Sequence, residues 1–238
     1  MAVNFQNPLF IDIETVGAPR DFEQLTSRMQ ALWMRKARTL GAENEEEARV
    51  LFRERGGIYA EFGKIIVIGL GYLGRDENGE EVFRLRTLAD DDEKALLQAF
   101  CDCLKGFPRN THFCGHNIKE FDIPYLCRRL VIANLPLPPA LDLAGKKPWE
   151  VQHIDTMELW KFGDRKSYTP LDLLGAILDV PSSKSDIDGS QVSNCYYEEK
   201  GGLERIARYC GRDVIATAQV YRRMKGLPLM QAKQMPLL

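Results

Sequence analysis

The 238-residue sequence has no apolar run that approaches the ~20 residues of a membrane span, so we expect no membrane partner. It also lacks an excess of positive charge: 32 Lys and Arg residues against 34 Asp and Glu residues give a net charge of −2. A protein that coats duplex nucleic acid carries a strongly basic surface, so that class is excluded, whereas a local nucleic-acid groove is not. There is no internal repeat and no low-complexity tract.

The six cysteines form no C-x-x-C pair, which disfavours a zinc ribbon or a disulfide scaffold. Scattered cysteines in a chain of this size are typical of reduced thiols in a cytosol. The first residues, MAVNFQNPLFIDIE, have no basic segment and soon reach acids, so a signal peptide is not expected. We therefore expect a cytoplasmic protein. The length favours a single domain over residues 1–238.

Strand-like and helix-like segments alternate along the chain, with a turn at residues 74–79 that predicts a hairpin. The predicted strands cover residues 8–15, 64–73, 81–88, 111–115 and 151–156. The predicted helices cover residues 90–104, 120–132, 157–161, 171–178 and 203–225. Residues 133–149 are expected to form an irregular surface excursion, and residues 182–193 a polar loop. This order predicts a mixed α/β sheet with helices on its faces.

A helical segment of about residues 21–57 interrupts this order between the first two strands. FEQLTSRMQALWMRKARTL places apolar residues at helical spacing, and a glycine pair ends the segment. We expect Leu25, Met29, Leu32 and Trp33 to pack on the domain's own flank. A lid, a partner-binding arm and a dimer element remain open as alternatives.

Two acids interrupt the apolar first strand, where an acid is costly. Because side chains alternate along a strand, Asp12 and Glu14 point to the same face, opposite Ile11 and Ile13. Two carboxylates ~4 Å apart repel each other by about 4 kcal/mol at an effective dielectric of about 20, unless a cation offsets the charge. Oxygen-only ligand sets attract hard divalent cations such as Mg²⁺. Solvated acids at the end of a half-exposed strand are the alternative interpretation.

Two further acids follow on predicted helices. Asp122 is expected in the first turn of a helix that follows a strand, where the helix dipole stabilises a carboxylate and where ligand sites form in α/β sheets. Tyr209 and Asp213 are four residues apart on the last helix, so they share a face. Alternatively, Asp122 is an ordinary helix-start acid, and the Tyr209–Asp213 pair is ordinary surface chemistry.

The order of these motifs is specific. Asp-x-Glu on the first strand, Asn-x-x-x-Phe-Asp after a later strand and Tyr-x-x-x-Asp in the final helix resemble the 3′–5′ exonucleases of the DEDD group. From about Leu9 to Tyr221 the chain most resembles stand-alone relatives of the proofreading exonuclease domain of family-B DNA polymerases. Tyr209 stands four residues before the last acid, and Arg208 rather than histidine stands five before it, which matches the tyrosine class.

The resemblance implies a fold, a reaction and a set of cofactors. The fold is RNase H-like, with a mixed five-stranded sheet flanked by helices. Asp12, Glu14, Asp122 and Asp213 would hold two divalent cations, Mg²⁺ or Mn²⁺. Because a phenol of pKa about 10 is a poor base at neutral pH, we expect Tyr209 to position the attacking water. The products would be nucleoside 5′-monophosphates from the 3′ ends of single-stranded DNA, in DNA repair or replication.

The resemblance also implies contacts to the substrate. Asn117 and Phe121 would contact the terminal nucleotide, although Phe121 could equally be a core residue. Lys184, in the polar loop, is expected to help track a phosphate backbone. Asp155 is either a fifth carboxylate of the site or a structural hydrogen-bond acceptor.

Other functions are weighed against this one. The same acids would serve a 3′–5′ exoribonuclease, because nothing in the motifs reads the 2′-hydroxyl. A non-catalytic nucleic-acid-binding module is the other alternative, but it has no reason to keep mutually repelling carboxylates. A dinucleotide-binding dehydrogenase is rejected: Gly69, Gly71 and Gly74 have the G-x-G-x-x-G spacing, but a hairpin rather than a helix follows them. No protein partner is predicted.

Overall fold

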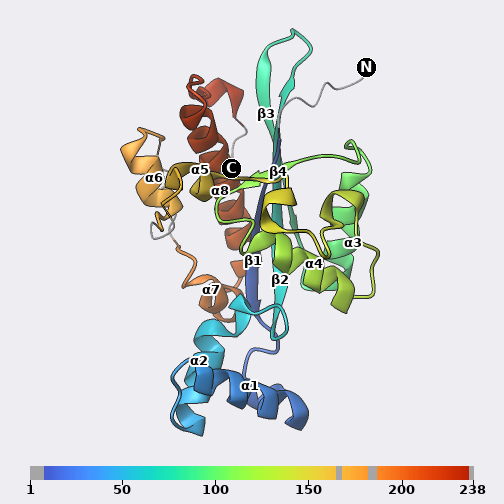
Figure 1. Ribbon diagram of the computed structural model, residues 1–238, viewed down its shortest axis with the longest axis vertical. Coiled ribbons are helices and arrows are strands. Elements are labelled where there is room, and N and C mark those ends of the chain that lie inside the picture. The colour runs from blue at the N-terminus through green and yellow to red at the C-terminus, as the bar shows by residue number, and fades with distance from the viewer. Residues whose placement is uncertain (1–7, 165–167, 182–186, 236–238) are drawn as a thin grey trace.

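The computed structural model describes residues 8–164, 168–181 and 187–235, and its strands form one mixed sheet in the order β3-β2-β1-β4-β5 (Figure 1). The strands are β1 Leu9–Gly17, β2 Gly63–Arg75, β3 Glu81–Ala89, β4 Phe113–Gly115 and β5 Ile154–Asp155. β2 is antiparallel to β1 and β3, whereas β4 runs parallel to β1 and β5 parallel to β4. The predicted α/β, RNase H-like sheet of five strands is confirmed, and the expected β2–β3 hairpin lies at its edge.

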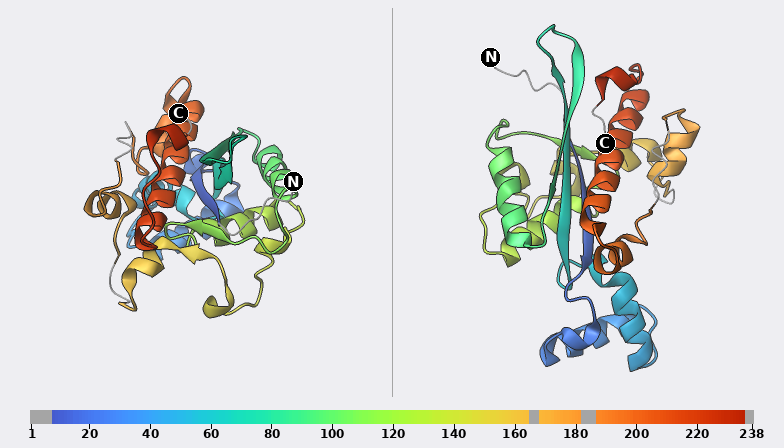
Figure 2. Two further views of the ribbon diagram at one scale, coloured as in Figure 1. Left: turned by 90° about the horizontal axis from the view of Figure 1, so that it is seen from above. Right: turned by 180° about the vertical axis from the view of Figure 1, so that it is seen from behind.

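Helices cover both faces of the sheet. The α-helices of the described residues are α1 Ser27–Thr39, α2 Glu45–Arg55, α3 Glu93–Leu104, α4 Asp122–Ile132, α5 Thr156–Lys161, α6 Leu171–Ile177, α7 Val192–Glu198 and α8 Gly202–Met224, of which α1 and α2 belong to the insertion and not to the faces of the sheet. α3 and α4 lie on one face and α8 on the other (Figures 1 and 2). No helix in the described ranges is long and apolar enough to cross a bilayer.

Two predictions about local structure were wrong. The fifth strand is shorter than expected, because pairing with β4 extends only over Cys114–Ile154 and Gly115–Asp155. The expected polar loop at 182–193 ends in a helix, α7, that was not predicted. Val192 and Cys195 of α7 are buried beside α8. Because α7 is only seven residues long, this tertiary burial, and not a local periodic pattern, holds it.

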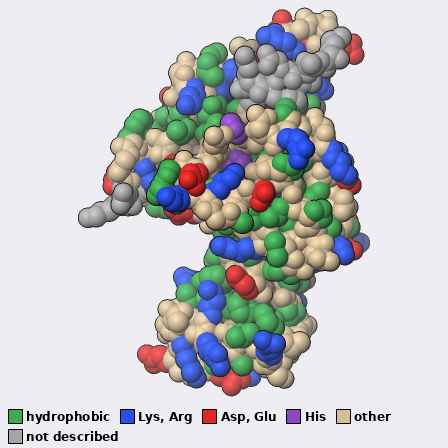
Figure 3. Space-filling model, turned by 45° about the vertical axis from the view of Figure 1, so that its right-hand side comes forward, with side chains coloured by type: hydrophobic (Ala, Val, Ile, Leu, Met, Phe, Trp, Pro, Cys, Tyr) green, Lys and Arg blue, Asp and Glu red, His purple; other side chains and the backbone are tan. Residues whose placement is uncertain are grey.

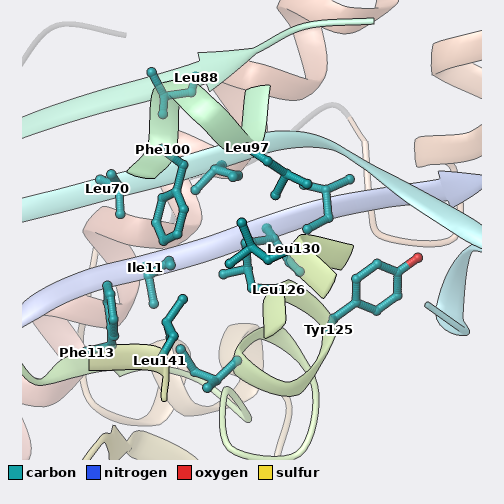
Figure 4. Packing of buried hydrophobic residues seen from close by; sticks show 14 of the residues in the cluster. Ile11, Leu70, Leu88, Leu97, Phe100, Phe113, Tyr125, Leu126, Leu130 and Leu141 are labelled. Carbon is teal, nitrogen blue, oxygen red and sulfur yellow. The ribbon is translucent and has the colours of Figure 1, made fainter. Parts of the chain in front are cut away.

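Side-chain alternation along β1 separates two apolar layers. Leu9, Ile11 and Ile13 face α3 and α4 and join the main core, which Figure 4 shows around Ile11. Phe10 points the other way and packs with Val214 of α8. Asp12 and Glu14 share the parity of Phe10, so they lie on the α8 face, as the alternation predicted.

A glycine in β2 lets α8 approach the sheet closely. Gly69 pairs with Asp12 in the antiparallel ladder. A β-carbon at this position would lie 2.7 Å from Cγ2 of Val214 and 2.9 Å from Sγ of Cys210. The glycine therefore serves the packing of α8 against the sheet, which accounts for the glycine-rich segment that was rejected as a dinucleotide motif.

The helical insertion between β1 and β2 builds a core of its own. Phe22, Trp33 and Phe52 are buried within it, and the Trp33 indole donates to the carbonyl oxygen of Ala48 at 2.7 Å. The segment extends beyond the end of β1 as a separate lobe (Figure 1). The expectation that this segment packs on the domain's own flank is therefore corrected: Leu25, Met29 and Trp33 pack within the insertion's own core, and Leu32 remains 40% exposed.

Candidate active site

Two carboxylates and a thiol meet on the α8 face of β1. One ligand atom from each of Asp12, Glu14 and Cys210 lies within 4.8 Å of the other two. Glu14 is 8% exposed, and Cys210 is completely buried. The Cys210 thiol donates to the backbone carbonyl of Asp12 at 3.5 Å, so α8 is joined to β1 at the first acid itself.

The third carboxylate comes from the first residue of α4. Asp122 is buried, and its Oδ1 accepts a hydrogen bond from the backbone amide of Ile13 at 3.1 Å. β4 pairs with β1 only at Leu9 and Phe10. Beyond that point the edge of β1 is open, and Asp122 takes a position between the two acids of the strand. The prediction that Asp122 stands in the first turn of a helix is confirmed.

The fourth carboxylate and the tyrosine come from the middle of α8. Ile206 and Val214 are buried under this helix. Tyr209 and Asp213 stand on its adjoining face, as their four-residue spacing predicted, and the two side chains are hydrogen-bonded to each other. The structure thus brings together all five of the residues that the sequence motifs singled out.

Burial and mutual repulsion dominate the electrostatics of the cluster. Burial raises the pKa of Asp12 well above its usual range, and the charges of Glu14, Asp122 and Asp213 raise it further. The pKa of Glu14 is raised for the same reasons, by burial first and then by Asp213 and Asp122. Burial raises the pKa of Asp122 to about 7. It raises that of Asp213 to about 6, with the hydrogen bond from Tyr209 acting in the opposite direction.

These side chains fit a divalent cation. The Oδ2 atom of Asp12 is buried and has no hydrogen-bond partner among the described residues. An unpartnered buried carboxylate oxygen is costly unless a cation or water reaches it. Carboxylate oxygens are the ligands that Mg²⁺ and Mn²⁺ prefer. A bound cation would therefore do two things: it would offset the repulsion between the acids, and it would give the unpartnered Oδ2 of Asp12 a partner.

The tyrosine of the site is a hydrogen-bond donor that keeps its proton. Burial raises the pKa of Tyr209 far above its usual value, and the negative charge of Asp213 adds to the effect. The phenol therefore stays protonated at physiological pH and can donate one hydrogen bond while its oxygen accepts another.

The loop before α4 is held by Asp155 and not by the carboxylates of the cluster. The carboxylate of Asp155 accepts from the backbone amides of Asn117 at 2.9 Å and Lys119 at 3.1 Å. It also caps α5 through the amide of Met157 at 2.9 Å. These bonds give Asp155 a structural role of the kind that was left open. They also fix Asn117 in a left-handed conformation, with φ of 63°.

Of the other expected substrate contacts, Phe121 is described and Lys184 is not. Phe121 is half-buried, packs against the main core, and has its ring centroid 5.4 Å from that of Tyr125. Its environment is thus intermediate between a core position and an exposed stacking platform. Lys184 lies outside the described residues.

Two residues near the cluster were not expected from the sequence. Cys210 could have been found, since it stands three residues before Asp213 and so shares a helix face with it. Asp172 of α6 could not: its charge raises the pKa of Asp213, yet it lies 41 positions away in a segment without a motif.

A cavity of about 750 Å³ lies elsewhere, between α4 and the irregular excursion after it. Ile123, Val131, Leu137 and Leu141 contribute to its walls. Charged side chains such as Lys119, Arg128 and Lys146 also line it. Among the described residues, however, the ligand atoms close enough to hold a metal ion are those of Asp12, Glu14 and Cys210. The carboxylate cluster is therefore the stronger candidate for a hydrolytic site.

An acidic cluster of this kind on an RNase H-like sheet defines a class, the nucleases that hydrolyse phosphodiester bonds. The family model of a predicted 3′–5′ exonuclease related to the exonuclease domain of PolB matches residues 58–233, and the chain belongs to this family. The resemblance inferred from the sequence is thereby confirmed. The matched range includes Asp122, Tyr209 and Asp213, whereas Asp12 and Glu14 precede it. A search among curated proteins finds no match to the chain.

Proposed function

We propose that this member of the family is a metal-dependent exonuclease that removes nucleoside 5′-monophosphates from the 3′ ends of single-stranded DNA. One observation carries the proposal: Asp12 lies among three other carboxylates, and its buried Oδ2 has no partner among the described side chains or amides. A protein that only binds nucleic acid gains nothing from this repulsion, whereas a phosphodiesterase needs cations at such a position.

The four carboxylates would hold two divalent cations, Mg²⁺ or Mn²⁺. Asp12, Glu14 and Asp213 are the expected ligands of one, and Asp12 also reaches the other. Asp122 would complete the site directly or through water, since its Oδ1 already accepts the Ile13 amide. When bound, the cations stabilise the entering and leaving oxygens of an in-line displacement and lower the pKa of bound water.

Tyr209 is the expected positioning group for the water. Its hydroxyl keeps its proton because its pKa is raised far above the usual value. The hydrogen bond to Asp213 holds the ring over the cluster. A neutral phenol in this position orients a nucleophile by hydrogen bonding and does not remove its proton.

The expected contacts to the terminal nucleotide come from the start of α4. Asn117 and Phe121 flank the turn that brings Asp122 to β1, so a nucleotide bound at the carboxylates would lie beside them. Lys184 remains a proposed backbone contact on sequence grounds. DNA is favoured over RNA because the family is related to the exonuclease domain of PolB; an exoribonuclease and a non-catalytic binding module are the alternatives that the assay distinguishes.

The test uses 5′-labelled single-stranded DNA and RNA of the same sequence, each with Mg²⁺, Mn²⁺ or EDTA. Asp213→Asn is the inactive variant, and Glu204→Gln, an exposed acid in the first turn of the same helix, is the matched control. We expect a ladder that shortens from the 3′ end with parent and control, and none with Asp213→Asn or EDTA. Faster degradation of RNA than of DNA would identify the protein as an exoribonuclease. No cleavage of either strand at enzyme excess would favour the non-catalytic binding module.

A further inference from the structure

The insertion presents one helix that is rich in positive charge and has no acid. α1 reads SRMQALWMRKART, with four basic residues and no acidic residue. Arg28 and Arg35 stand seven residues apart, close to two full turns, and Arg38 follows about one turn later. All three are exposed. The fourth basic residue, Lys36, turns inward over the ring of Tyr59 at 3.8 Å.

The charges of this face are not neutralised within the described chain. None of the three exposed arginines forms an ion pair with another described residue. The next helix differs: Arg49 of α2 pairs with Glu45 at 2.6 Å and with Glu23 at 3.3 Å. The insertion therefore has both signs of charge, and three of its exposed cations that have no acidic partner among the described residues, Arg28, Arg35 and Arg38, stand on α1. Figure 3 shows Lys and Arg side chains gathered on the lower lobe, which the insertion forms.

The insertion is a rigid support for this face. Trp33 of α1 is completely buried, and its ring lies edge-on to that of Phe52 of α2, with centroids 5.1 Å apart. The helix starts are capped: the side chain of Thr26 accepts from the amide of Met29, and that of Asn44 from Glu47. Helices that are capped and packed in this way hold the backbone positions of their exposed side chains in a fixed arrangement.

The support is also anchored beside the candidate active site. β1 carries the acids and then leads directly into the insertion, with Gly17 only about 10 Å along the strand from Glu14. The hydroxyls of Thr15 and Tyr125 both donate to the carbonyl of Gly57, each at 2.8 Å. The return end of the insertion is thus tied to the same strand and to the helix that begins with Asp122.

We propose that the exposed face of α1 formed by Arg28, Leu32, Arg35 and Arg38, the α1 basic face, binds the phosphate backbone of the polynucleotide substrate upstream of its 3′ end. The inference rests on the proposed nuclease function. The chain has a net charge of −2, so overall charge does not attract a polyanion, and local arrays must do so. Arginine suits this task because its planar guanidinium pairs with phosphate oxygens bidentately.

The test compares two triple variants that lose the same charge. Arg28→Gln, Arg35→Gln and Arg38→Gln together remove the α1 basic face. Lys94→Gln, Arg109→Gln and Lys233→Gln together form the control, since these exposed cations lie outside the insertion. Melting temperatures of both proteins verify that the fold is kept.

Binding is measured in EDTA, so that no strand is cut, by fluorescence anisotropy with a single-stranded 20-mer between 50 and 200 mM salt. Three lost phosphate contacts should lower the salt slope of log K by about 2 and weaken binding about tenfold at low salt. The control should match the parent. If α1 contacts the strand upstream of its 3′ end, a trinucleotide, whose few phosphates would be held at the carboxylate cluster, should bind the two triple variants with equal affinity.

Equal binding of the 20-mer by the two triple variants would overturn the proposal. So would an arginine variant that binds strands as the parent does but loses affinity for anionic phospholipid vesicles, which would assign the face to a membrane surface. Cleavage by the parent is scored separately. If the parent cleaves and the α1 substitutions do not change the binding of the 20-mer, only this inference is overturned. If the substitutions weaken binding but the parent does not cleave, only the proposed function is overturned.

Discussion

Asp122 accepts a hydrogen bond from the backbone amide of Ile13, at 3.1 Å, across the open edge of the central strand. Ile13 is the residue between the two acids of β1, so this bond places the first turn of α4 at the centre of the cluster. The same carboxylate therefore serves two purposes. It satisfies a buried amide that β4 leaves unpaired, and it adds a charge whose pKa burial raises to about 7.

Substitutions of Asp122 should separate these two roles. Asp122→Asn keeps an acceptor for the Ile13 amide and removes the charge, so we expect stability at or above that of the parent in EDTA at pH 8. Asp122→Ala leaves the amide buried without a partner and should cost about 1–3 kcal/mol. Urea unfolding measures both. Equal losses in the two variants would mean that the hydrogen bond contributes nothing.

The stability of the metal-free protein should depend on pH through Asp213. Its pKa is raised from 3.8 to about 6, mainly by burial, so the folded chain holds this proton more tightly than the unfolded chain does. The contribution to stability is present below pH 4 and is lost as the pH rises through 6. Asp213→Asn should therefore match the parent at low pH and exceed it by about 3 kcal/mol above pH 7. Thermal melts from pH 4 to pH 8 in EDTA check this; a difference that does not change with pH would contradict it.

Tyr209→Phe should reduce the rate without weakening the metal site. The substitution removes the hydroxyl and its bond to Asp213 but keeps the ring. Loss of one positioned hydrogen-bond group costs about 10²–10³-fold in kcat in comparable sites. We expect that loss, together with an unchanged dependence of activity on Mg²⁺ concentration. Because the pKa of Tyr209 lies far above its usual value, the parent's rate should show no decline between pH 8 and pH 10 from its ionisation.

Gly69→Ala should move α8 away from the sheet. The new β-carbon would lie 2.7 Å from Val214 and 2.9 Å from Cys210, so the helix that carries Asp213 must shift. Overpacking of this kind costs about 1–3 kcal/mol. Gly175→Ala is the control: it lies in α6, its β-carbon would come no closer than 3.9 Å to a neighbour, and helix propensity predicts a gain of about 0.5–1 kcal/mol. Activity and urea unfolding are measured for both variants. A Gly69→Ala variant with the activity and the unfolding midpoint of the parent would disprove the close packing of α8 on Gly69.

The positions of the catalytic candidates along their own elements followed from periodicity. Alternation put Asp12 and Glu14 on one face of β1, and the four-residue spacing put Tyr209 and Asp213 on one face of α8. These relations are local, so backbone geometry is enough to derive them. The order of the motifs then indicated the family, which the match to residues 58–233 bears out.

Features held by tertiary contacts did not follow from the sequence. α7 is too short for a periodic signal and exists because Val192 and Cys195 are buried. The apolar residues of the insertion were expected to pack on the domain's own flank, because helical spacing shows which residues are apolar but not what they pack against. In the structure Trp33 packs against Phe52 within the insertion.

By itself the sequence determined the class of fold, the family and the five residues of the candidate site, because these depend on residue type and on spacing within single strands and helices. Only the tertiary structure decided that the carboxyls raise one another's pKa, that Asp122 reaches the Ile13 amide, and that Asp155 holds the loop at Asn117. Those relations join segments far apart in the chain. Their distances are set by how the helices pack on the sheet, and no local pattern encodes that packing.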